Sequence, residues 1–498
     1  MNKYSASLFN FLFNSTNSIV AIINGIVLVP IYFKFMSIST YGAWLATGNI
    51  VAMIGLMESG FASVITQKMS EALGKKKDRF FIQLASANLF TGIFMSILLF
   101  LLGLLFSPFI ADWINADISI HNSITIAFII SLASSSLSLI VSFIGAFPQV
   151  WHDTKITGLF STIVNIIGVI SLIIFLYLGF GVVALALGHL TRSILNFLTL
   201  GIWVLLKWKK KKLSKPKFNI SVIKMLLKDS FYPFLNKISS VIMGNSQNFI
   251  LAFFISPSIA AVYDITSKIA VVSCNFVGTI NSSFFGFFSL TFASKNNIEI
   301  NKIIKNVYMF FTILLVSCLL YALVFTKPFV HFLVGLDKYG GNILLYLIVF
   351  SILISQLKNY FNSLLYSGGL INKSAILDII SMLLYIIFLL ILINPAGIYA
   401  IPIAISFSGI LFIGMYLRLL KKYLFIDVKN LLIHSLNLLL IITPFIVINY
   451  FMKLNLLNIS ILITYVVIFS IIYISVVGFS NKKFINWIYL EFNNAKNK

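Results

Sequence analysis

The sequence predicts an all-α integral membrane protein of about fourteen transmembrane helices, and three observations lead to that prediction. Sixty per cent of the 498 residues are hydrophobic and only 10% are charged, which is more apolar surface than a soluble protein of this size can bury. The apolar residues form continuous runs of about 20 residues or more, the length of a helix that crosses a bilayer. The basic residues lie mostly between those runs, so the net charge of +23 indicates cytoplasmic loops rather than a nucleic-acid partner.

Fourteen apolar runs with polar residues at their ends are the predicted helices. In chain order they are 8–35, 41–66, 83–106, 123–147, 156–178, 181–206, 230–255, 261–290, 303–326, 343–366, 374–393, 397–419, 431–451 and 458–479. Strands of a membrane barrel alternate apolar and polar residues over about ten positions, whereas these runs are continuously apolar. The first run is too long for the apolar core of a signal peptide, and no small-residue cleavage site follows it, so we expect it to be retained.

The loops between the predicted helices differ in charge on the two sides of the membrane. With a cytoplasmic N-terminus, the lysine clusters all fall in cytoplasmic loops. These clusters are 75–77, 207–217, 421–422 and 482–483. On the opposite side, loop 107–122 has no lysine or arginine, and loop 327–342 is mixed, with Lys327 and Lys338 beside Asp337. The positive-inside rule then predicts that both termini are cytoplasmic and that the number of helices is even.

The longest basic stretch follows the sixth predicted helix and separates two halves. The predicted organisation is a six-helix bundle over 1–206, a basic cytoplasmic linker over 207–229, a second six-helix bundle over 230–420, and two additional helices with a basic cytoplasmic tail over 421–498. A shift of 222 residues superposes the first predicted helix on the seventh. It aligns Phe9 with Phe231, Asn14 with Asn236, Ser18 with Ser240, and Tyr41 with Tyr263. Six helices in each half give both halves one topology, as in parallel transporter repeats.

The predicted loops are too short to form a catalytic or nucleotide-binding domain, since none exceeds about 25 residues. The chain has no phosphate-binding loop, zinc-protease motif or serine-hydrolase motif. Cys274 and Cys318 lie inside apolar runs without the spacing of metal ligands. We therefore expect a transporter without catalytic residues, metal or cofactor. Its energy would come from an ion gradient, the membrane potential or the substrate's own gradient.

Four cationic side chains lie one to three turns inside their predicted helices: Arg192, Lys237, Lys268 and Lys358. A charge at the centre of a membrane helix costs about 2.5–3.5 kcal/mol, so it persists where it has a partner or an aqueous environment. One interpretation is that these long side chains extend to the lipid headgroups. The other is a water-filled cationic cavity that binds an anion such as a phosphate or pyrophosphate group. His189, one turn before Arg192, is expected to be a packed neutral histidine.

Uncharged polar residues follow one face of several predicted helices. Those assigned to the cavity are Asn14, Asn17, Asn236, Ser240, Asn248 and Asn275. The alternative is that they join helices to one another by hydrogen bonds. Three acids inside predicted helices, Glu58, Asp264 and Asp378, are candidates for ion coupling or for structural partners of the cations. Asp264 precedes Lys268 by four residues and can pair with it.

A motif in the first two predicted helices resembles a known family of transporters. The stretch Pro30-Ile31-Tyr32-Phe33-Lys34-Phe35-Met36 is followed by Tyr41-Gly42-Ala43-Trp44 and then by Glu58-Ser59-Gly60-Phe61-Ala62. This pattern resembles the opening of the Wzx-type O-antigen flippases. They form the polysaccharide transporter branch of a superfamily with a MATE-like fold, which also holds multidrug extruders and lipid II flippases. Two positions depart from the pattern: Ala62 replaces its last glycine, and Met36-Ser37 replaces its Leu-Gly.

The resemblance implies a function and a set of partners. The family moves undecaprenyl-pyrophosphate-linked oligosaccharide, such as the O-antigen repeat unit of lipopolysaccharide, from the cytoplasmic to the periplasmic leaflet of the bacterial inner membrane by alternating access. The lipid tail stays among membrane lipids. Expected partners also include a proton or sodium ion, a polysaccharide polymerase and a chain-length regulator. Carrying about two negative charges outward releases roughly 4–5 kcal/mol per 100 mV, so ATP is not required.

Three other functions stay open on the sequence. A lipid II flippase of the same superfamily shares the helix number and a cationic cavity. A multidrug or cation antiporter shares the fold but needs a net acidic cavity, whereas cations exceed acids in the predicted helices here. An integral-membrane O-antigen polymerase or ligase needs a sizeable periplasmic loop, and the largest loop predicted on that side has about sixteen residues.

Overall fold

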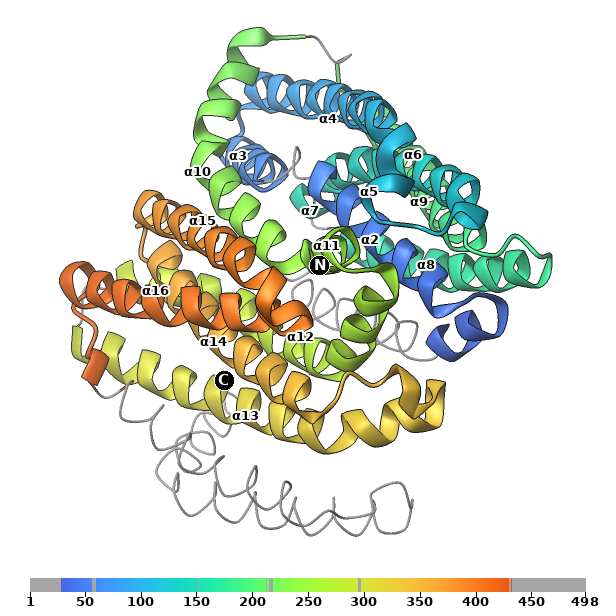
Figure 1. Cartoon of the computed structure of the whole chain (residues 1–498). Coiled ribbons are helices and arrows are strands. Elements are labelled where there is room, and N and C mark those ends of the chain that lie inside the picture. The colour runs from blue at the N-terminus through green and yellow to red at the C-terminus, as the bar shows by residue number, and fades with distance from the viewer. Residues whose placement is uncertain are drawn as a thin grey trace. The chain divides into compact units, whose positions relative to one another are not determined.

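The structure of the chain, a computed structural model, is helical in the part that it describes (Figure 1). It describes residues 28–55, 60–151, 153–211, 213–214, 218–293, 297–429 and 431. No strand occurs among these residues, as the continuous apolar runs predict. Most of the first predicted helix and nearly all of the last two lie outside the described residues. The count of fourteen helices and the cytoplasmic termini therefore stay predictions.

The described α-helices follow one another with short connections. They are α2 Ile38–Ile54, α3 Phe61–Gly74, α4 Asp78–Phe106, α5 Ile110–Trp113, α6 His121–Ile144, α7 Ala146–Val150, α8 Thr154–Tyr177, α9 Val183–Lys210, α10 Ile220–Asn245, α11 Gln247–Phe254, α12 Pro257–Ala293, α13 Asn297–Val334, α14 Asn342–Ser367, α15 Ile371–Ala396 and α16 Ala400–Leu424. A further helical stretch over 28–35 precedes α2.

Seven segments of the described chain are long and apolar enough to cross a membrane. They are Asp78–Trp113, Ile118–Val150, Gly158–Tyr177, Val183–Lys210, Ile300–Val334, Asn342–Ser367 and Ile371–Leu424. The last segment contains both α15 and α16, which a 3-10 turn at Gly397–Tyr399 separates. Large apolar side chains such as Ile97, Leu105 and Ile391 are exposed on these helices, as is typical of a surface in contact with lipid. The chain is a multi-pass membrane protein.

Several observed helices differ from the apolar runs that predict them, among them the second and the seventh. The predicted helix 41–66 is interrupted between α2 and α3, where Gly60 has a φ of +88°. The predicted helix 230–255 consists of α10 and α11, and α10 already begins at Ile220. Asn219 caps that start, because its Oδ1 accepts hydrogen bonds from Ser221 N at 3.1 Å and Val222 N at 3.4 Å. The prediction rested on hydrophobicity, so it identified only the apolar part of α10. The first turns of this helix contain charged residues and were therefore assigned to the linker.

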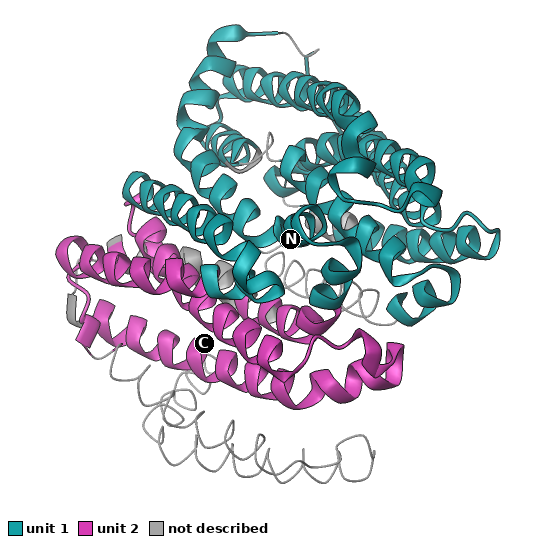
Figure 2. Cartoon of the chain, in the orientation of Figure 1, with its two compact units in different colours: residues 1–264, 371–404 teal, residues 265–370, 405–498 magenta. Residues whose placement is uncertain are grey.

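The described helices group into two compact units (Figure 2). Unit 1 comprises residues 1–264 and 371–404, and unit 2 comprises 265–370 and 405–498. In unit 1, α6 packs against α4 and α9, α8 packs against α9, and α10 packs against α15. In unit 2, α13 packs against α14. The division into two six-helix bundles at 207–229 stays a prediction.

Helix α10 contacts α3 at two places within unit 1. Asp229 forms an ion pair with Lys68 of α3 at 2.6 Å. One turn further along, the backbone of Pro233 and Phe234 comes so close to Gly60, at the start of α3, that a Cβ there would lie 2.7 Å from the Phe234 nitrogen. Only glycine fits this position, both for its positive φ and for this close approach.

The short helix α11 is held at both ends by asparagine side chains of the preceding part of unit 1. At its start, Asn49 Oδ1 of α2 accepts hydrogen bonds from the backbone nitrogens of Asn248 at 2.9 Å and Phe249 at 3.2 Å. At its end, Asn115 Nδ2 donates to the carbonyl oxygens of Ala252 at 3.0 Å and Phe253 at 2.7 Å. These bonds satisfy backbone groups that have no partner inside the helix.

Replacing Asn49 with alanine is expected to lower stability by about 1–2 kcal/mol, because two half-buried backbone donors of α11 lose their acceptor. The measurement is the melting temperature of the detergent-solubilised protein. Asn245→Ala is the matched control, since Asn245 is an exposed asparagine at the end of α10. Equal melting temperatures for the two variants would show that Asn49 does not stabilise α11.

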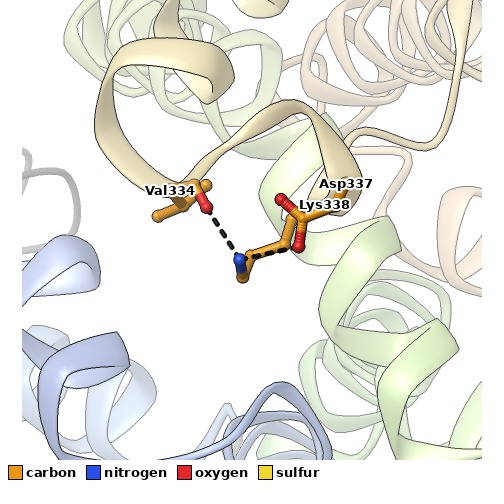
Figure 3. A network of polar contacts seen from close by, with 3 residues as sticks. All are labelled: Val334, Asp337 and Lys338. Carbon is orange, nitrogen blue, oxygen red and sulfur yellow. Dashed lines mark hydrogen bonds and ion pairs between the residues drawn. The ribbon is translucent and has the colours of Figure 1, made fainter.

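The turn after α13 contains Asp337 and Lys338 of the predicted loop 327–342, whereas Lys327 lies within α13, which continues to Val334. Figure 3 shows that Lys338 Nζ donates to the Val334 carbonyl oxygen at 2.8 Å and to Asp337 Oδ2 at 2.9 Å. The Val334 carbonyl lies at the C-terminus of α13, where carbonyl groups need outside donors and cations suit the helix dipole. The hydrogen bond from Lys338 also lowers the pKa of Asp337. Capping of α13 therefore accounts for a lysine in a loop predicted to lie opposite the cytoplasm.

Candidate functional site

Arg192 of α9 is the predicted cation whose surroundings in unit 1 are most fully defined. Its side chain is half-buried, and its Nη2 lies 2.7 Å from Nδ1 of His189, one turn earlier on the same helix. Arginine can only donate, so Nδ1 accepts and the imidazole is neutral. One face of the imidazole meets Trp44 of α2, whose ring is stacked at 6.0 Å between centroids. This agrees with the expectation that His189 is a packed neutral histidine.

Contacts from α6 and α8 fix the turn of α9 that carries Arg192. Ser193 Oγ lies 2.8 Å from the hydroxyls of both Ser134 and Ser138 of α6, and it donates to the His189 carbonyl at 3.0 Å. On the α8 side, a Cβ at Gly168 would lie 3.0 Å from the Arg192 Cβ, so the missing side chain at 168 leaves room for the arginine. The backbone and Cβ of Arg192 are thus positioned by packing against two neighbouring helices.

The remaining guanidinium donors of Arg192 are not used by an acid. Among the residues that the structure describes, no carboxylate forms an ion pair with Arg192. Tyr32, in the helical stretch 28–35, lies within electrostatic range of it. A guanidinium has five N–H donors in a planar fork, and among the described residues only His189 accepts a hydrogen bond from it. The site can therefore bind a bidentate anion, because phosphate and carboxylate groups match that fork.

The two predicted acids that the structure describes both accept hydrogen bonds inside unit 1. Asp378 of α15 is only 4% exposed, and its Oδ2 accepts a hydrogen bond of 2.5 Å from Asn236 Nδ2 of α10. Asp264 of α12 is half-buried, and its Oδ2 accepts a hydrogen bond of 3.3 Å from the Tyr41 hydroxyl of α2. The structure thus brings the predicted residues Asn236 and Asp378 together. A role of either acid in ion coupling stays a prediction.

The predicted polar residues of α10 and α11 have different environments. Lys237 and Ser240 are exposed on α10, and Ser240 Oγ donates to the Lys237 carbonyl at 2.9 Å. In the described part of the chain, Lys237 forms no ion pair. Asn248 is half-buried, and its backbone nitrogen takes part in the contact with Asn49. Lys237 and Ser240 therefore offer polar groups on the α10 surface, whereas Asn248 also serves to hold α11.

The other predicted site residues either belong to unit 2 or lie outside the described residues. In unit 2, Lys358 of α14 is only 5% exposed, so protein encloses its side chain and the interpretation that it extends to the headgroups does not hold for it. Lys268 is half-buried and Asn275 is exposed on α12. Asn14, Asn17 and Glu58 lie outside the described residues, and their assignment stays a prediction.

Sequence reasoning did not identify the roles of three residues around these contacts. Trp44 stacks on His189, Tyr41 donates to Asp264, and Asn49 holds α11. Tyr41 and Trp44 belong to the motif Tyr41-Gly42-Ala43-Trp44, so the sequence marked this segment but not the contacts that these residues make. Its glycine has a separate role: a Cβ at Gly42 would lie 1.7 Å from the carbonyl oxygen of Pro257, at the start of α12. The motif therefore places α2 directly against α12.

Comparison with known proteins shows the family. The model of a family described as "polysaccharide biosynthesis protein" matches residues 7–292, which is more than half of the chain. The chain belongs to the polysaccharide biosynthesis protein family. No curated protein matches the sequence. The predicted relationship to the polysaccharide transporter branch is confirmed by this match together with the structural similarities below.

Several solved structures of membrane transporters share the fold of this chain. The lipid II flippase MurJ in an inward closed conformation aligns with a TM-score of 0.70 and 17% identity, over 94% of this chain and 99% of that chain. An inward-facing multidrug resistance MATE family transporter of the MOP superfamily aligns with a TM-score of 0.63 and 12% identity, over 84% and 94%. The MATE transporter VcmN of Vibrio cholerae aligns with a TM-score of 0.59 and 16% identity, over 84% and 99%. The prediction of a transporter rather than an enzyme is confirmed at the level of family and fold.

Proposed function

We propose that this family member is a flippase that moves a polyprenyl-pyrophosphate-linked oligosaccharide, of the O-antigen repeat-unit type, from the cytoplasmic to the periplasmic leaflet of a bacterial inner membrane by alternating access. The observation that carries the proposal is the Arg192 guanidinium. It contacts His189, on a turn of α9 that packs against Gly168 and the α6 serines, and among the described residues no acid neutralises it. A family of polysaccharide biosynthesis proteins supplies the substrate class.

The pyrophosphate of such a substrate suits the cations of this chain. Arg192 offers a planar pair of donors for two phosphate oxygens. Lys237, exposed on α10 without an ion pair in the described residues, offers a second point charge. The sugar chain would be recognised by neutral polar groups such as Ser240 and by aromatic rings such as Trp44. The polyprenyl tail needs no polar site and stays in the lipid.

The hydrogen bond of Asp378 gives the proposed flippase a route for ion coupling. The Asp378 carboxylate accepts the Asn236 amide across the α10–α15 contact, and a charged acceptor makes this bond strong. Protonation of Asp378 replaces it by a weaker, neutral bond. A proton can in this way change how firmly α10 is held to α15. The outward movement of about two negative charges releases roughly 4–5 kcal/mol per 100 mV in addition, so coupling is an aid rather than a requirement.

Replacing Arg192 with glutamine is expected to lower flipping of undecaprenyl-pyrophosphate-linked oligosaccharide at least tenfold, because one desolvated charge-assisted contact to phosphate is lost. Purified protein is reconstituted in liposomes, and the rate at which a labelled glycan becomes accessible on the opposite leaflet is measured. Arg418→Gln is the matched control, since Arg418 is an exposed arginine on α16. Arg192→Lys keeps the charge without the fork and should give an intermediate rate.

The same liposomes separate the proposed function from its alternatives. An Arg192→Gln protein that flips at the rate of the Arg418→Gln protein would refute the anion site. Lipid II carries the same pyrophosphate, so a faster rate with lipid II than with the oligosaccharide would instead assign the chain to lipid II transport. Export of a cationic drug without any flipping of either lipid would assign it to the antiporters.

A further inference from the structure

Aromatic rings and lysines gather where α9 ends. Phe147 and Trp151, from α7 and the residue after it, meet Trp203 and Trp208 of α9, and we call these four residues the tryptophan cluster. Ring centroids lie 5.4 Å apart for Phe147 and Trp151, 5.9 Å for Trp151 and Trp203, and 5.8 Å for Phe147 and Trp208. Trp151 is only 9% exposed. Tryptophan is typical of the level where acyl chains meet headgroups.

Two of the four lysines at this end of α9 contact the tryptophan cluster. Lys207 Nζ lies 5.0 Å from the Trp203 ring and also forms an ion pair with Asp153. Lys211 Nζ lies 5.7 Å from the Trp151 ring. Trp208 Nε1 donates to the Ser214 carbonyl at 3.2 Å, which ties the following chain to the cluster. The charge of Lys207 is therefore balanced within the protein, and the cluster gives the end of α9 a fixed position.

The other two lysines, Lys209 and Lys210, lie on α9 directly after an exposed apolar face of the same helix. Both are exposed. Leu205 and Leu206, four residues before them, are each 63% exposed. Residues four apart lie on the same face of a helix, one turn or about 5.4 Å further along. In a membrane protein an exposed apolar face lies against acyl chains, so the next turn lies at the depth of the headgroups.

We propose that Lys209 and Lys210, with Lys211 beside them, bind the phosphate of an anionic phospholipid in the leaflet at this end of α9. Charge complementarity identifies the partner, because among the described residues only one of the four lysines between 207 and 211 forms an ion pair, Lys207 with Asp153. The apolar face formed by Leu205 and Leu206 receives the acyl chains of the same lipid. The tryptophan cluster supports the site from the protein side.

The lipid site is separate from the proposed substrate site on the same helix. Lys209 is seventeen positions after Arg192, which is about 25 Å along a helix. A phospholipid held at Lys209 and Lys210 fixes how deeply α9 sits in the bilayer, and it thereby fixes the depth of Arg192 as well. Flipping should accordingly be faster in membranes that contain an anionic phospholipid.

The test measures binding of phosphatidylglycerol to the full chain, by native mass spectrometry of protein released from micelles that contain equal amounts of phosphatidylglycerol and phosphatidylcholine. The double variant Lys209→Gln, Lys210→Gln should lose at least tenfold in phosphatidylglycerol affinity relative to phosphatidylcholine. The control is Lys76→Gln, Lys77→Gln, which removes the same charge from exposed lysines between α3 and α4.

Three outcomes decide the proposal. Loss of binding in the first double variant alone supports it. Equal loss in both double variants means that net charge, not a site, attracts the lipid, and unchanged binding in the first variant excludes the site directly. Arg192→Gln should keep phosphatidylglycerol binding while flipping is lost, so failure of the lipid site and failure of the proposed transport function can be told apart. Equal melting temperatures in neutral micelles verify that all variants are folded.

Discussion

Replacing Gly42 with alanine is expected to cost more than about 3 kcal/mol and to remove most of the folded protein from detergent extracts. The added Cβ would lie 1.7 Å from the Pro257 carbonyl oxygen and 2.5 Å from its carbonyl carbon. These are backbone atoms, so no rotamer change makes room, and α2 must move away from α12. That movement also separates Tyr41 from Asp264, whose hydrogen bond crosses the same contact.

Gly48→Ala in the same helix provides the control for Gly42→Ala. Gly48 is exposed, and nothing lies within 4 Å of an added Cβ. Alanine favours a helix over glycine by about 0.5–1 kcal/mol, so this variant should be as stable as the unchanged protein or slightly more so. The yield of monodisperse protein and its melting temperature are measured for both. Equal melting temperatures for Gly42→Ala and Gly48→Ala would show that α2 does not approach α12 so closely.

Replacing Gly60 with alanine is expected to cost about 3 kcal/mol or more from two sources. Its φ of +88° is a left-handed conformation that costs an L-residue about 1–2 kcal/mol. In addition, the Cβ would lie 2.7 Å from the Phe234 nitrogen and 2.9 Å from the Pro233 carbonyl carbon, so α3 and α10 must separate. The melting temperature and the flipping rate should both fall, because α10 carries Asn236 and Lys237.

Gly179→Ala is the control that separates the two contributions to the loss of stability in Gly60→Ala. Gly179 has a nearly equal φ of +85°, and nothing lies within 4 Å of an added Cβ. It should therefore show the conformational cost alone. The difference between the two variants measures the crowding of α3 against α10, and a difference near zero would contradict that close contact.

The helical class of the fold could be predicted from the sequence because lipid imposes it. Backbone groups in a bilayer must pair within the segment, so continuous apolar runs become helices. The interruption between α2 and α3 was not predicted, since apolar residues lie on both sides of the short polar segment Glu58-Ser59-Gly60. Gly60 is the local sign of that break, and its meaning depends on Pro233, which lies far away in the sequence.

The candidate site could be predicted only where its contacts are local. Arg192 and His189 are three residues apart, so one helix turn brings them together and the sequence indicates the pair. Asn236 and Asp378 were both recognised as polar residues in apolar helices. Their hydrogen bond, however, joins positions 142 residues apart, and that of Tyr41 and Asp264 spans 223. Such pairings depend on how helices pack, which a single sequence does not specify.

The contacts of α10 have a mechanical consequence. Asp229, Pro233 and Asn236 follow one another at intervals of four and three residues, so the ion pair with Lys68, the approach to Gly60 and the bond to Asp378 lie along one face. Three attachments in a row prevent the helix from turning about its own axis. If protonation of Asp378 loosens one of them, the other two preserve the helix register. A change at this acid can therefore alter transport without unfolding the protein.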